Sequence, residues 1–421
     1  MPYTEQDHER FLRMLFDCAV DAVLPSRVLP PFLPQEPKGR TVVLAVGKAA
    51  SAMADVAATN WKGPLSGLVV TRHGHAHRSL SRHNDIELIE AGHPIPDQNS
   101  VAGARRALEL AQGLEKDDLA LVLLSGGGSA LWCLPIPALS LEEKQRITSH
   151  LLLAGATIGE LNTVRRSLSQ IKGGRLAEAA SPARVETLII SDVTGDDPAT
   201  IASGPTVKSG GTLADVLEIL ARYRLELPQA VQKAVRERSP PAFDENRNRC
   251  QIVAAGKDAL AAAEQAARSY GCDVLMLGDA IEGEARKAAA EQALIARKVT
   301  QSGTPTVILS GGELTVAVRD RNGIGGPNTE FLLALAIELG GIEGVYAIAC
   351  DTDGIDGVGE NAGAVIRPDT LERARAKRID PQKALDRSDS FRFFEALGDL
   401  VVTGPTQTNV SDFRAMVVSR D

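Results

Sequence analysis

The sequence predicts an α/β protein with two domains. Short apolar runs, of which 41–46 and 119–124 are the clearest, alternate with segments whose apolar residues have helical spacing. This alternation is typical of a parallel sheet that is covered by helices on both faces and binds ligands at the carboxyl ends of its strands. A chain of 421 residues also exceeds one ordinary hydrophobic core. We therefore expect a first domain at 1–240 and a second, smaller one at 241–421.

Each expected element follows from its local pattern. Phe11, Leu12, Leu15 and Phe16 recur at helical spacing, and the proline-rich stretch that begins at Pro25 ends that helix. Continuous apolar runs give the strands. In the first half we expect helices at 11–23, 49–54, 100–112, 140–157 and 172–180, and strands at 41–46, 67–71, 86–90, 119–124 and 185–191. In the second half we expect helices at 257–270, 283–301 and 328–339, and strands at 250–254, 273–277, 305–309, 313–319, 345–350 and 399–402.

The composition excludes several classes of function. Hydrophobic residues make up 44% and charged residues 24%, which is typical of a globular protein, whereas aromatic residues, at 4%, are too scarce for a base-stacking surface. A net charge of -8 opposes binding to nucleic acid or anionic membranes. The amphipathic N-terminus resembles neither a signal peptide nor an anchor, and the five cysteines form no CxxC pair. We expect a cytoplasmic protein with reduced thiols and no nucleic-acid or membrane partner.

A glycine-rich turn follows the most apolar predicted strand. The run 119–124 ends at five small residues, Ser125, Gly126, Gly127, Gly128 and Ser129. Their lack of side-chain bulk lets backbone N–H groups surround an anion such as a phosphate, although a plain strand-to-helix turn is the alternative. A similar turn, Gly311-Gly312-Glu313, follows the strand at 305–309. Two such turns indicate one ligand held between two halves of the chain.

Basic residues stand beside other small residues. Lys48 follows Gly47 where a strand turns into a helix, and its charge is unfavourable at a helix N-terminus unless an anion shares the site. Lys172 precedes Gly173 in what we expect to be a second anion-binding turn. Arg165 offers a bidentate donor to a carboxylate or phosphate. For each cation, a solvated side chain is the alternative interpretation.

Acidic turns follow two further predicted strands. Asp192 comes after the strand at 185–191, and Asp351 and Asp353 come after the strand at 345–350. Carboxylates in such positions can hold Mg2+ through one or two oxygens and accept a hydroxyl proton, and plain Asx turns are the alternative. The segment lacks the later glutamate of a calcium loop, so magnesium is the expected ion.

Several common motifs are missing. His73, His75 and His77 alternate, but no cysteine or HExxH pattern completes a zinc site, so we expect His75 and His93 to form hydrogen bonds near the active site instead. The sequence contains no GxxxxGK[ST], no HRD or DFG, no GxGxxG and no GxSxG. These absences disfavour Walker-type nucleotide binding, protein kinases, dinucleotide-dependent dehydrogenases and serine hydrolases.

Eight motifs, spread in order over nearly the whole chain, resemble those of the glycerate 2-kinases, the class II glycerate kinases with a MOFRL C-terminal domain. They are VGKAA at 46–50, EAGHPIPD at 90–97, LLSGGGSAL at 123–131, NTVRRSLSQIKGGRLA at 162–177, SDVTGDDPATIASGPT at 191–206, LSGGELTV at 309–316, GGPNTEFLLALA at 325–336 and DTDGIDG at 351–357. The chain departs from the family pattern at Pro327, where the family has an arginine. This departure leaves open how the phosphate donor binds.

The resemblance implies a fold and a reaction. The first domain is expected to be a Rossmann-like α/β/α sandwich with a mostly parallel sheet, the second a smaller MOFRL-type α/β domain with a mixed sheet, and the active site is expected in the cleft between them. The implied reaction is phosphorylation of D-glycerate at its 2-hydroxyl by ATP and Mg2+, giving 2-phosphoglycerate and ADP. Lys48 and Arg165 are expected to bind the carboxylate or the transferring phosphoryl group, and Asp192 to orient or deprotonate the hydroxyl.

The same resemblance, with the turns described above, assigns the binding residues. The expected ATP contacts are Ser125, Gly126, Gly127, Gly128, Ser129, Lys172, Gly173, Gly311, Gly312 and Asn328. The expected metal ligands are Asp192, Glu313, Asp351 and Asp353.

Two other functions are weighed against the kinase. An NAD(P)H-dependent hydroxypyruvate reductase, a name that some relatives carry, is expected to show the dinucleotide fingerprint that this sequence lacks. A non-catalytic sensor of a sugar acid and a nucleotide does not require Asp192. The sequence leaves open the preference for glycerate over longer sugar acids, domain closure and the oligomeric state, for which a homodimer is one option.

Overall fold

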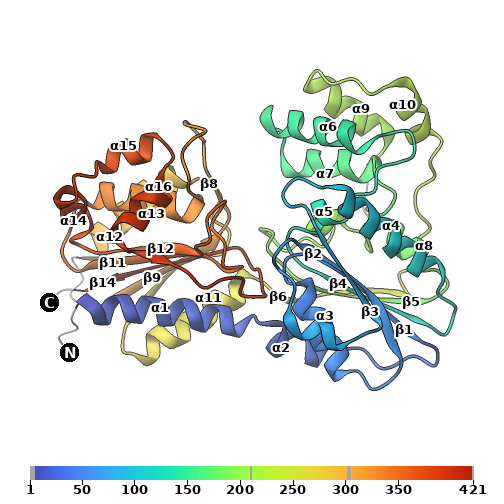
Figure 1. Cartoon of the computed structure of the whole chain (residues 1–421), viewed down its shortest axis with the longest axis horizontal. Coiled ribbons are helices and arrows are strands. Elements are labelled where there is room, and N and C mark those ends of the chain that lie inside the picture. The colour runs from blue at the N-terminus through green and yellow to red at the C-terminus, as the bar shows by residue number, and fades with distance from the viewer. Residues whose placement is uncertain (1–4, 209–210, 301–304, 420–421) are drawn as a thin grey trace. The chain divides into compact units, whose positions relative to one another are not determined.

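The computed structural model describes residues 5–208, 211–300 and 305–419. The chain forms two compact units, and each is discontinuous in sequence (Figure 1). The parallel-sheet unit comprises residues 28–191 and 196–253, and the mixed-sheet unit comprises the described parts of 1–27, 192–195 and 254–421. The expected division at residues 240/241 falls before strand β6, which continues the sheet of the parallel-sheet unit.

The sheet of the parallel-sheet unit has six strands in the order β3-β2-β1-β4-β5-β6. All four pairings from β3 to β5 are parallel, and Val46 lies opposite Leu124 at the carboxyl ends of β1 and β4. Strands β1 and β4 are buried along their whole length, which is why they read as continuous apolar runs. The strands are β1 (Thr41–Val46), β2 (Leu65–Arg72), β3 (Ile86–Ala91), β4 (Leu119–Leu124), β5 (Arg184–Ile190) and β6 (Asn248–Ala254).

Some helices of this unit contact the sheet, and others form a cluster of their own. Helices α3 and α4 contact β1 and β2. Helices α6, α7, α9 and α10 gather separately (Figure 1) around a small core of leucine, isoleucine and valine side chains. The helices are α3 (Ala50–Asn60), α4 (Gln98–Gln112), α5 (Gly128–Leu131), α6 (Leu141–Leu153), α7 (Ile158–Ser167), α8 (Arg175–Ala179), α9 (Leu213–Arg222) and α10 (Gln229–Arg236), with 3-10 turns η1 (Pro30–Phe32), η2 (Arg78–Arg82) and η3 (Ile201–Ser203). The short helix α2 (Pro25–Val28) spans the division of the chain at residues 27/28.

Two helix boundaries predicted for this unit are wrong, and in both cases glycines are the reason. The helix expected at 140–157 ends at Leu153, and Gly155, with φ of 79°, separates it from α7, which the sequence did not predict. The helix expected at 172–180 begins only at Arg175, because Gly173 and Gly174 have φ of 65° and 85°. Such backbone values are natural for glycine and incompatible with a right-handed helix.

The second sheet has the order β13-β12-β11-β14-β9-β7 and is mixed, because β7 and β9 pair in parallel while the other pairings are antiparallel. Helices α1 and α11 cover one face, and α12 to α16 cover the other (Figure 1). The elements are α1 (Glu5–Ala22), α11 (Gly256–Ser269), β7 (Asp273–Gly278), β8 (Gly283–Glu284), α12 (Ala285–Val299), β9 (Thr306–Gly312), β10 (Leu314–Thr315), α13 (Pro327–Leu339), β11 (Val345–Asp351), β12 (Gly363–Ile366), α14 (Thr370–Ala376), α15 (Pro381–Asp386), α16 (Ser390–Leu397), β13 (Leu400–Val401) and β14 (Asp412–Val418).

The two ends of the chain meet in this unit. Helix α1 packs against α11 and β14. The rings of Phe16 and Phe413 lie 5.8 Å apart, and Ser419 Oγ lies 3.4 Å from His8 Nε2 across 411 positions of sequence. The first helix therefore depends on the last strand for part of its apolar contacts.

The sequence did not predict strand β14, although β14 lies inside the mixed sheet between β11 and β9. All seven of its residues are buried, including Asp412 and Arg414. Arg414 Nη1 donates to Asp412 Oδ2 at 2.9 Å, and Arg414 also donates to the carbonyl of Gly311. This buried ion pair interrupts the apolar pattern that identifies an interior strand. Conversely, the strand expected at 313–319 is only the two-residue β10.

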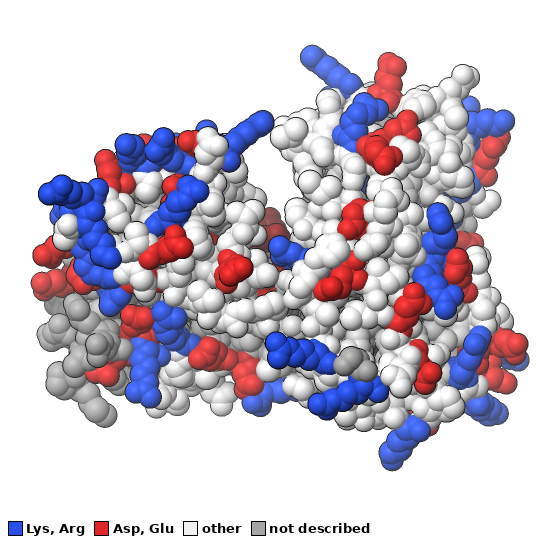
Figure 2. Space-filling view, viewed as in Figure 1, with Lys and Arg blue, Asp and Glu red and all other residues white. Residues whose placement is uncertain are grey.

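Two α/β units, one on a mostly parallel sheet and one on a mixed sheet, confirm the predicted fold class. No described helix is long and apolar enough to cross a membrane. On the face shown in Figure 2, acidic and basic side chains are interspersed without a continuous basic stripe. All five cysteines are free.

We expect Arg414→Met to destabilise the protein by about 3–5 kcal/mol, because the substitution leaves the buried carboxylate of Asp412 without its cation. Urea unfolding measures the change. Arg268→Met, which removes an exposed pairing with Glu264 on α11, is the matched control and is expected to cost less than about 1 kcal/mol. Equal effects of the two substitutions would contradict the role given to the buried pair.

Candidate active site

Two turns interlock at the carboxyl edge of the parallel sheet. Because β1 and β4 are adjacent and in register, the turn at 47–49 lies beside the turn at 125–127. Ser125 Oγ accepts a hydrogen bond from the N–H of Ala49 at 3.0 Å, and the N–H of Lys48 donates to the carbonyl of Gly126 at 2.8 Å. A Cβ on Gly47 would stand 2.1 Å from Ser125 Oγ, so only glycine fits. The two turns form one rigid structure.

The glycine-rich turn is arranged to receive an anion. Gly127 has φ of 82°, and the N–H groups of Gly126 and Gly127 donate to no acceptor among the described residues. A Cβ on Gly127 would stand 3.0 Å from the His93 ring and 3.5 Å from Lys48 Cγ, so both side chains flank this turn. Successive amide donors beside a lysine match the needs of a phosphate or carboxylate. The structure thus places Lys48 beside the glycine-rich turn.

A chain of polar side chains connects the turn to α7. Ser129 Oγ lies 2.8 Å from Ser203 Oγ, which donates to Asn162 Oδ1 at 3.1 Å. Ala202 and Ser203 both have positive φ, 51° and 60°, and a Cβ on Gly128 would stand 2.8 Å from that of Ala202. The left-handed backbone at these residues costs free energy and persists because the surrounding contacts impose it. Asn162 and Ser203 were not among the predicted site residues, although both lie within motifs that carry the resemblance.

Three cations, two of them buried and one half-buried, lie behind this turn. Lys144 and Lys172 are 5% and 1% exposed, and Arg165 is half-buried. Lys144 Nζ donates to Cys133 Sγ at 3.3 Å, and Lys172 Nζ donates to the carbonyl of Ala202 at 3.2 Å. Among the described residues, none of the three cations forms an ion pair with a carboxylate. We call these three residues the cation cluster.

The cations of the cluster repel one another. Burial lowers the pKa of the Lys172 ammonium well below its usual value, and the nearby charges of Lys144 and Arg165 lower it further. Burial also lowers the pKa of Lys144 and of Arg165, while the neighbouring Cys133 opposes the shift in both. Gathering cations out of water without a counter-charge is unfavourable, and a bound anion removes the cost. Buried cations of this kind are typical of functional sites.

A cavity of about 200 Å³ opens onto this cluster. Lys144, Arg165 and Ser129 contribute polar groups to its lining, and the loop at 94–96 closes one side. Gln145 Nε2 donates to the carbonyl of Pro96 at 2.7 Å, which ties α6 to that loop. The cavity, which we call the small cavity, is of a size suited to a small organic acid.

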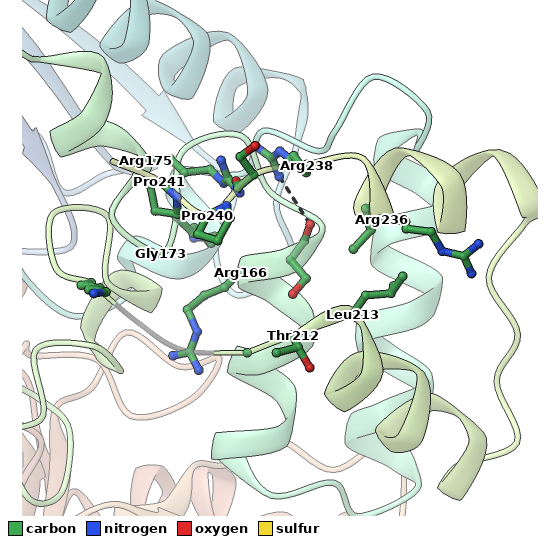
Figure 3. A pocket seen from close by; sticks show the side chains of 15 residues that line it. Arg166, Gly173, Arg175, Thr212, Leu213, Arg236, Arg238, Pro240 and Pro241 are labelled. Carbon is green, nitrogen blue, oxygen red and sulfur yellow. Dashed lines mark hydrogen bonds between the residues drawn. The ribbon is translucent and has the colours of Figure 1, made fainter. Parts of the chain in front are cut away.

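A second cavity, of about 440 Å³, lies on the other side of Lys172 and Gly173. Figure 3 shows Arg175, Arg238 and two prolines at one end and Arg166 at the other. We call it the basic pocket. Its lining residues are Arg166, Ser167, Lys172, Gly173, Arg175, Lys208, Gly211, Thr212, Leu213, Val235, Arg236, Arg238, Ser239, Pro240 and Pro241.

Asp192 belongs to the mixed-sheet unit, with the segment 192–195. Its Oδ2 accepts a hydrogen bond from Asn409 Nδ2 at 2.9 Å, and its carbonyl accepts one from Ser411 Oγ at 2.6 Å. Residues just before β14 therefore fix both the carboxylate and the backbone of Asp192.

The other predicted residues of the mixed-sheet unit serve visible structural roles. Asn328 Nδ2 donates to Asp412 Oδ1 at 2.7 Å, and a Cβ on Gly312 would stand 2.4 Å from backbone atoms of Ile281. The carbonyls of Gly311 and Gly312 accept hydrogen bonds from Arg414. Pro327 is the first residue of α13, where its missing N–H costs nothing.

The acidic turn after β11 is built from Asx hydrogen bonds. Asp351 Oδ1 accepts from the N–H of Asp353 at 2.9 Å, and Asp353 Oδ1 accepts from the N–H of Ile355 at 2.7 Å. Asp356 caps α13 by accepting from Asn328 and Thr329, and burial raises its pKa to about 6. In the described part of the chain, no group of three or more His, Cys, Asp or Glu side chains is arranged to hold a metal ion.

The structure thus brings together Lys48, Ser125–Ser129, Arg165, Lys172 and Gly173 in the parallel-sheet unit, and places Asp192, Gly311, Gly312, Glu313, Asn328, Asp351 and Asp353 in the mixed-sheet unit. Lys144 and Cys133 were missed. Lys144 lies in a helix whose many polar residues indicate a surface, and no pattern marks its ammonium as buried.

The fold and the site define an α/β protein with a glycine-rich turn and a cluster of cations at the carboxyl edge of a parallel sheet, which is where proteins of this class commonly bind ligands. Two family models match the chain, "Domain of unknown function (DUF4147)" over residues 11–236 and "MOFRL family" over residues 306–412. The chain therefore belongs to the family that combines these two domains, the glycerate 2-kinase family.

Its relatives carry two names. The chain is 48% identical to a "Putative hydroxypyruvate reductase" of Agrobacterium vitis, over 99% of this chain and 96% of that protein. It is 39% identical to the "D-glycerate 2-kinase" of Thermotoga maritima, over 94% of each. A crystal structure of glycerate kinase from Thermotoga maritima matches with a TM-score of 0.86 and 37% identity, over 97% of this chain and 99% of that one.

We expect Lys144→Met to leave the free energy of unfolding unchanged or raised, because methionine fills the space without a buried charge. The same substitution should reduce the stabilisation that inorganic phosphate gives to the wild-type protein, since binding stabilises the folded state and the substitution removes one of the cations that attract the anion. Thermal unfolding with and without phosphate measures both effects. Lys116→Met, at an exposed lysine of the same unit, is the control. A purely structural Lys144 would give the reverse result, with lower stability and an unchanged response to phosphate.

Proposed function

We propose that this protein phosphorylates D-glycerate at its 2-hydroxyl, using ATP and giving 2-phosphoglycerate and ADP. The observation that carries the proposal is the cation cluster, whose three cations have no carboxylate partner among the described residues; two of them, Lys144 and Arg165, line a small cavity beside an amide-lined turn. Membership of the glycerate 2-kinase family supplies the reaction class. Phosphoryl transfer needs positioning and charge neutralisation more than covalent chemistry, and this site offers both.

The small cavity takes the acid. Arg165 presents a planar fork that matches a carboxylate, and Lys144 adds an ammonium that is already desolvated. Both cations line the cavity, and its volume of about 200 Å³ suits a three-carbon acid. Binding of the carboxylate relieves the repulsion within the cluster. Longer sugar acids must displace the loop at 94–96 to enter.

The glycine-rich turn takes the transferring phosphoryl group. The N–H groups of Gly126 and Gly127 are available to donate to one anion, with Lys48 beside them, and Ser129 connects this turn to the small cavity. Fixed dipoles and cations stabilise the charge that spreads over the phosphoryl oxygens in the transition state. Lys172 adds a positive charge from the cation cluster. We retain Ser125, Gly128, Gly173, Gly311, Gly312 and Asn328 as proposed contacts or supports of ATP.

Asp192 is proposed to orient or deprotonate the 2-hydroxyl. Its hydrogen bond from Asn409 holds the carboxylate in one orientation. A positioned base of this kind contributes to the rate by accepting the proton that the hydroxyl loses.

Mg2+ is the proposed metal. It usually binds proteins through one or two carboxylates and completes its coordination with water and substrate phosphates, so a three-residue cage is not required. The adjacent carboxylates of Asp351 and Asp353 fit this donor set, and Glu313 and Asp192 are the other proposed ligands. The ion would supply charge neutralisation of the phosphates. We also propose a cytoplasmic location, which five free cysteines fit, and leave a homodimer to be tested.

A coupled assay of ADP release with D-glycerate and Mg-ATP tests the proposal. We expect turnover that depends on all three components, and phosphorus NMR should identify 2-phosphoglycerate as the product. A product phosphorylated at the 3-hydroxyl would overturn the orientation given to the substrate. Absence of ADP formation would overturn the function itself.

We expect Asp192→Asn to lower kcat by about 10²–10⁴-fold while the affinity for D-glycerate, measured by calorimetry, stays close to the wild-type value. The substitution keeps the shape of the side chain and removes only its basicity. Asp244→Asn, at an exposed carboxylate of the parallel-sheet unit, is the control. Full activity of Asp192→Asn would exclude the proposed base.

The name of the Agrobacterium relative favours hydroxypyruvate reduction as a second candidate function. Against it, the turn after β4 continues into the four-residue helix α5, and the third glycine of a dinucleotide fingerprint is replaced by Leu131. Oxidation of NADH by hydroxypyruvate, followed by absorbance, distinguishes the two functions. We expect none.

A further inference from the structure

The basic pocket is separate from the small cavity, and of its lining residues only Lys172 and Gly173 have a part in the reaction proposed above. The two cavities share no lining residue, and Arg165 and Arg166, consecutive on α7, line one each. We propose that the basic pocket is a second ligand site, which binds a phosphorylated organic molecule.

The lining of the pocket is basic, although the protein as a whole has a net negative charge. Six lining residues are basic and none is acidic, although the whole protein has more acidic than basic residues, 54 against 46. Among the described residues, these six cations form one ion pair, between Arg175 Nη1 and Glu178 Oε2 at 3.8 Å. Glu178 is not part of the pocket lining. The excess positive charge therefore calls for anions from solution.

The arginines of the pocket are held in place by neutral groups. Arg238 Nη1 donates to the carbonyl of Ser169 at 2.6 Å, and Arg175 Nη2 donates to the carbonyl of Ser239 at 3.2 Å. These bonds orient the guanidinium groups without neutralising them. Burial and the neighbouring Arg175 lower the pKa of Arg238 to about 10, and Glu178 opposes part of this shift.

Arg166 has unused hydrogen-bonding capacity. Its Nη1 and Nη2 donate to Ala199 and Thr163 at 3.3 Å, but its buried Nε has no acceptor among the described residues. A half-buried guanidinium with one N–H group that has no hydrogen-bond acceptor can bind an acceptor oxygen of a ligand. With Arg166 at one end and Arg175 and Arg238 at the other, the pocket offers cations on two sides (Figure 3).

The walls indicate that the ligand has an organic part. Leu213, Val235, Pro240 and Pro241 present apolar surface between the cations. Inorganic phosphate would contact only the guanidinium groups, and the apolar surface would remain exposed to water. A volume of about 440 Å³ accommodates a ring or a short carbon chain together with a phosphate.

Calorimetry with two probes tests the proposal on the full chain. We expect phenyl phosphate to bind the wild-type protein about tenfold more tightly than inorganic phosphate, because the ring covers the apolar walls. Leu213→Trp, which fills the pocket and keeps its charge, should remove that advantage. Arg166→Gln, which shortens the side chain and removes a charge, should weaken both probes.

Arg236→Gln is the matched control. Arg236 lines the pocket with its stem, but its guanidinium points away (Figure 3), so this substitution should leave both affinities unchanged. The proposal would be overturned if Leu213→Trp and Arg166→Gln bound phenyl phosphate as tightly as the wild-type protein does. It would also be overturned if Arg236→Gln weakened the binding of the probes as much as Arg166→Gln does. The measurement needs no turnover, so its outcome is independent of whether the protein phosphorylates glycerate. Circular dichroism of each variant confirms that a loss of binding is not a loss of fold.

Discussion

The contact between the turns after β1 and β4 is the constraint on which the parallel-sheet unit depends. Ser125 occupies the space that a side chain at position 47 would need, and its hydroxyl accepts the N–H of Ala49. The start of α3 and the glycine-rich turn are therefore fixed together. Because Lys48 stands between them, its position beside Gly127 follows from the backbone and not from packing of its own side chain.

The cation cluster shows a different principle. Burying Lys144, Arg165 and Lys172 near one another lowers stability, and the nearby thiol and carbonyl offset only part of that cost. The small helical cluster of α6, α7, α9 and α10 supplies the apolar packing that tolerates it. Functional sites commonly trade stability for ligand affinity in this way, and the gain here is a site desolvated before the ligand arrives.

The sequence predicted the fold class and the glycine-rich turn because both leave local patterns. Strands β1 and β4 are continuous apolar runs, and the five small residues after β4 mark a turn wherever they occur. Strand β14 was missed because Asp412 and Arg414 neutralise each other only in three dimensions. Helix α7 was missed because Gly155, which breaks the helical run, has no effect on apolar spacing.

The candidate site was predictable to the same extent. Lys48, Arg165 and Lys172 stand beside small residues or within motifs, so local sequence points to them. Lys144 has the same neighbours as any surface lysine, and its burial depends on Cys133, eleven positions away. Asn409 and Asp192 are 217 positions apart, and no local pattern connects them. Contacts between distant residues therefore set the limit of prediction.

The packing of α1 on β14 has a consequence for synthesis on the ribosome. The first helix emerges long before the strand that it covers, and the contact between His8 and Ser419 closes a loop of nearly the whole chain. The parallel-sheet unit can form while the apolar side of α1 is still exposed, a state that favours aggregation. The mixed-sheet unit cannot close before strand β14, which lies between β11 and β9, has been synthesised.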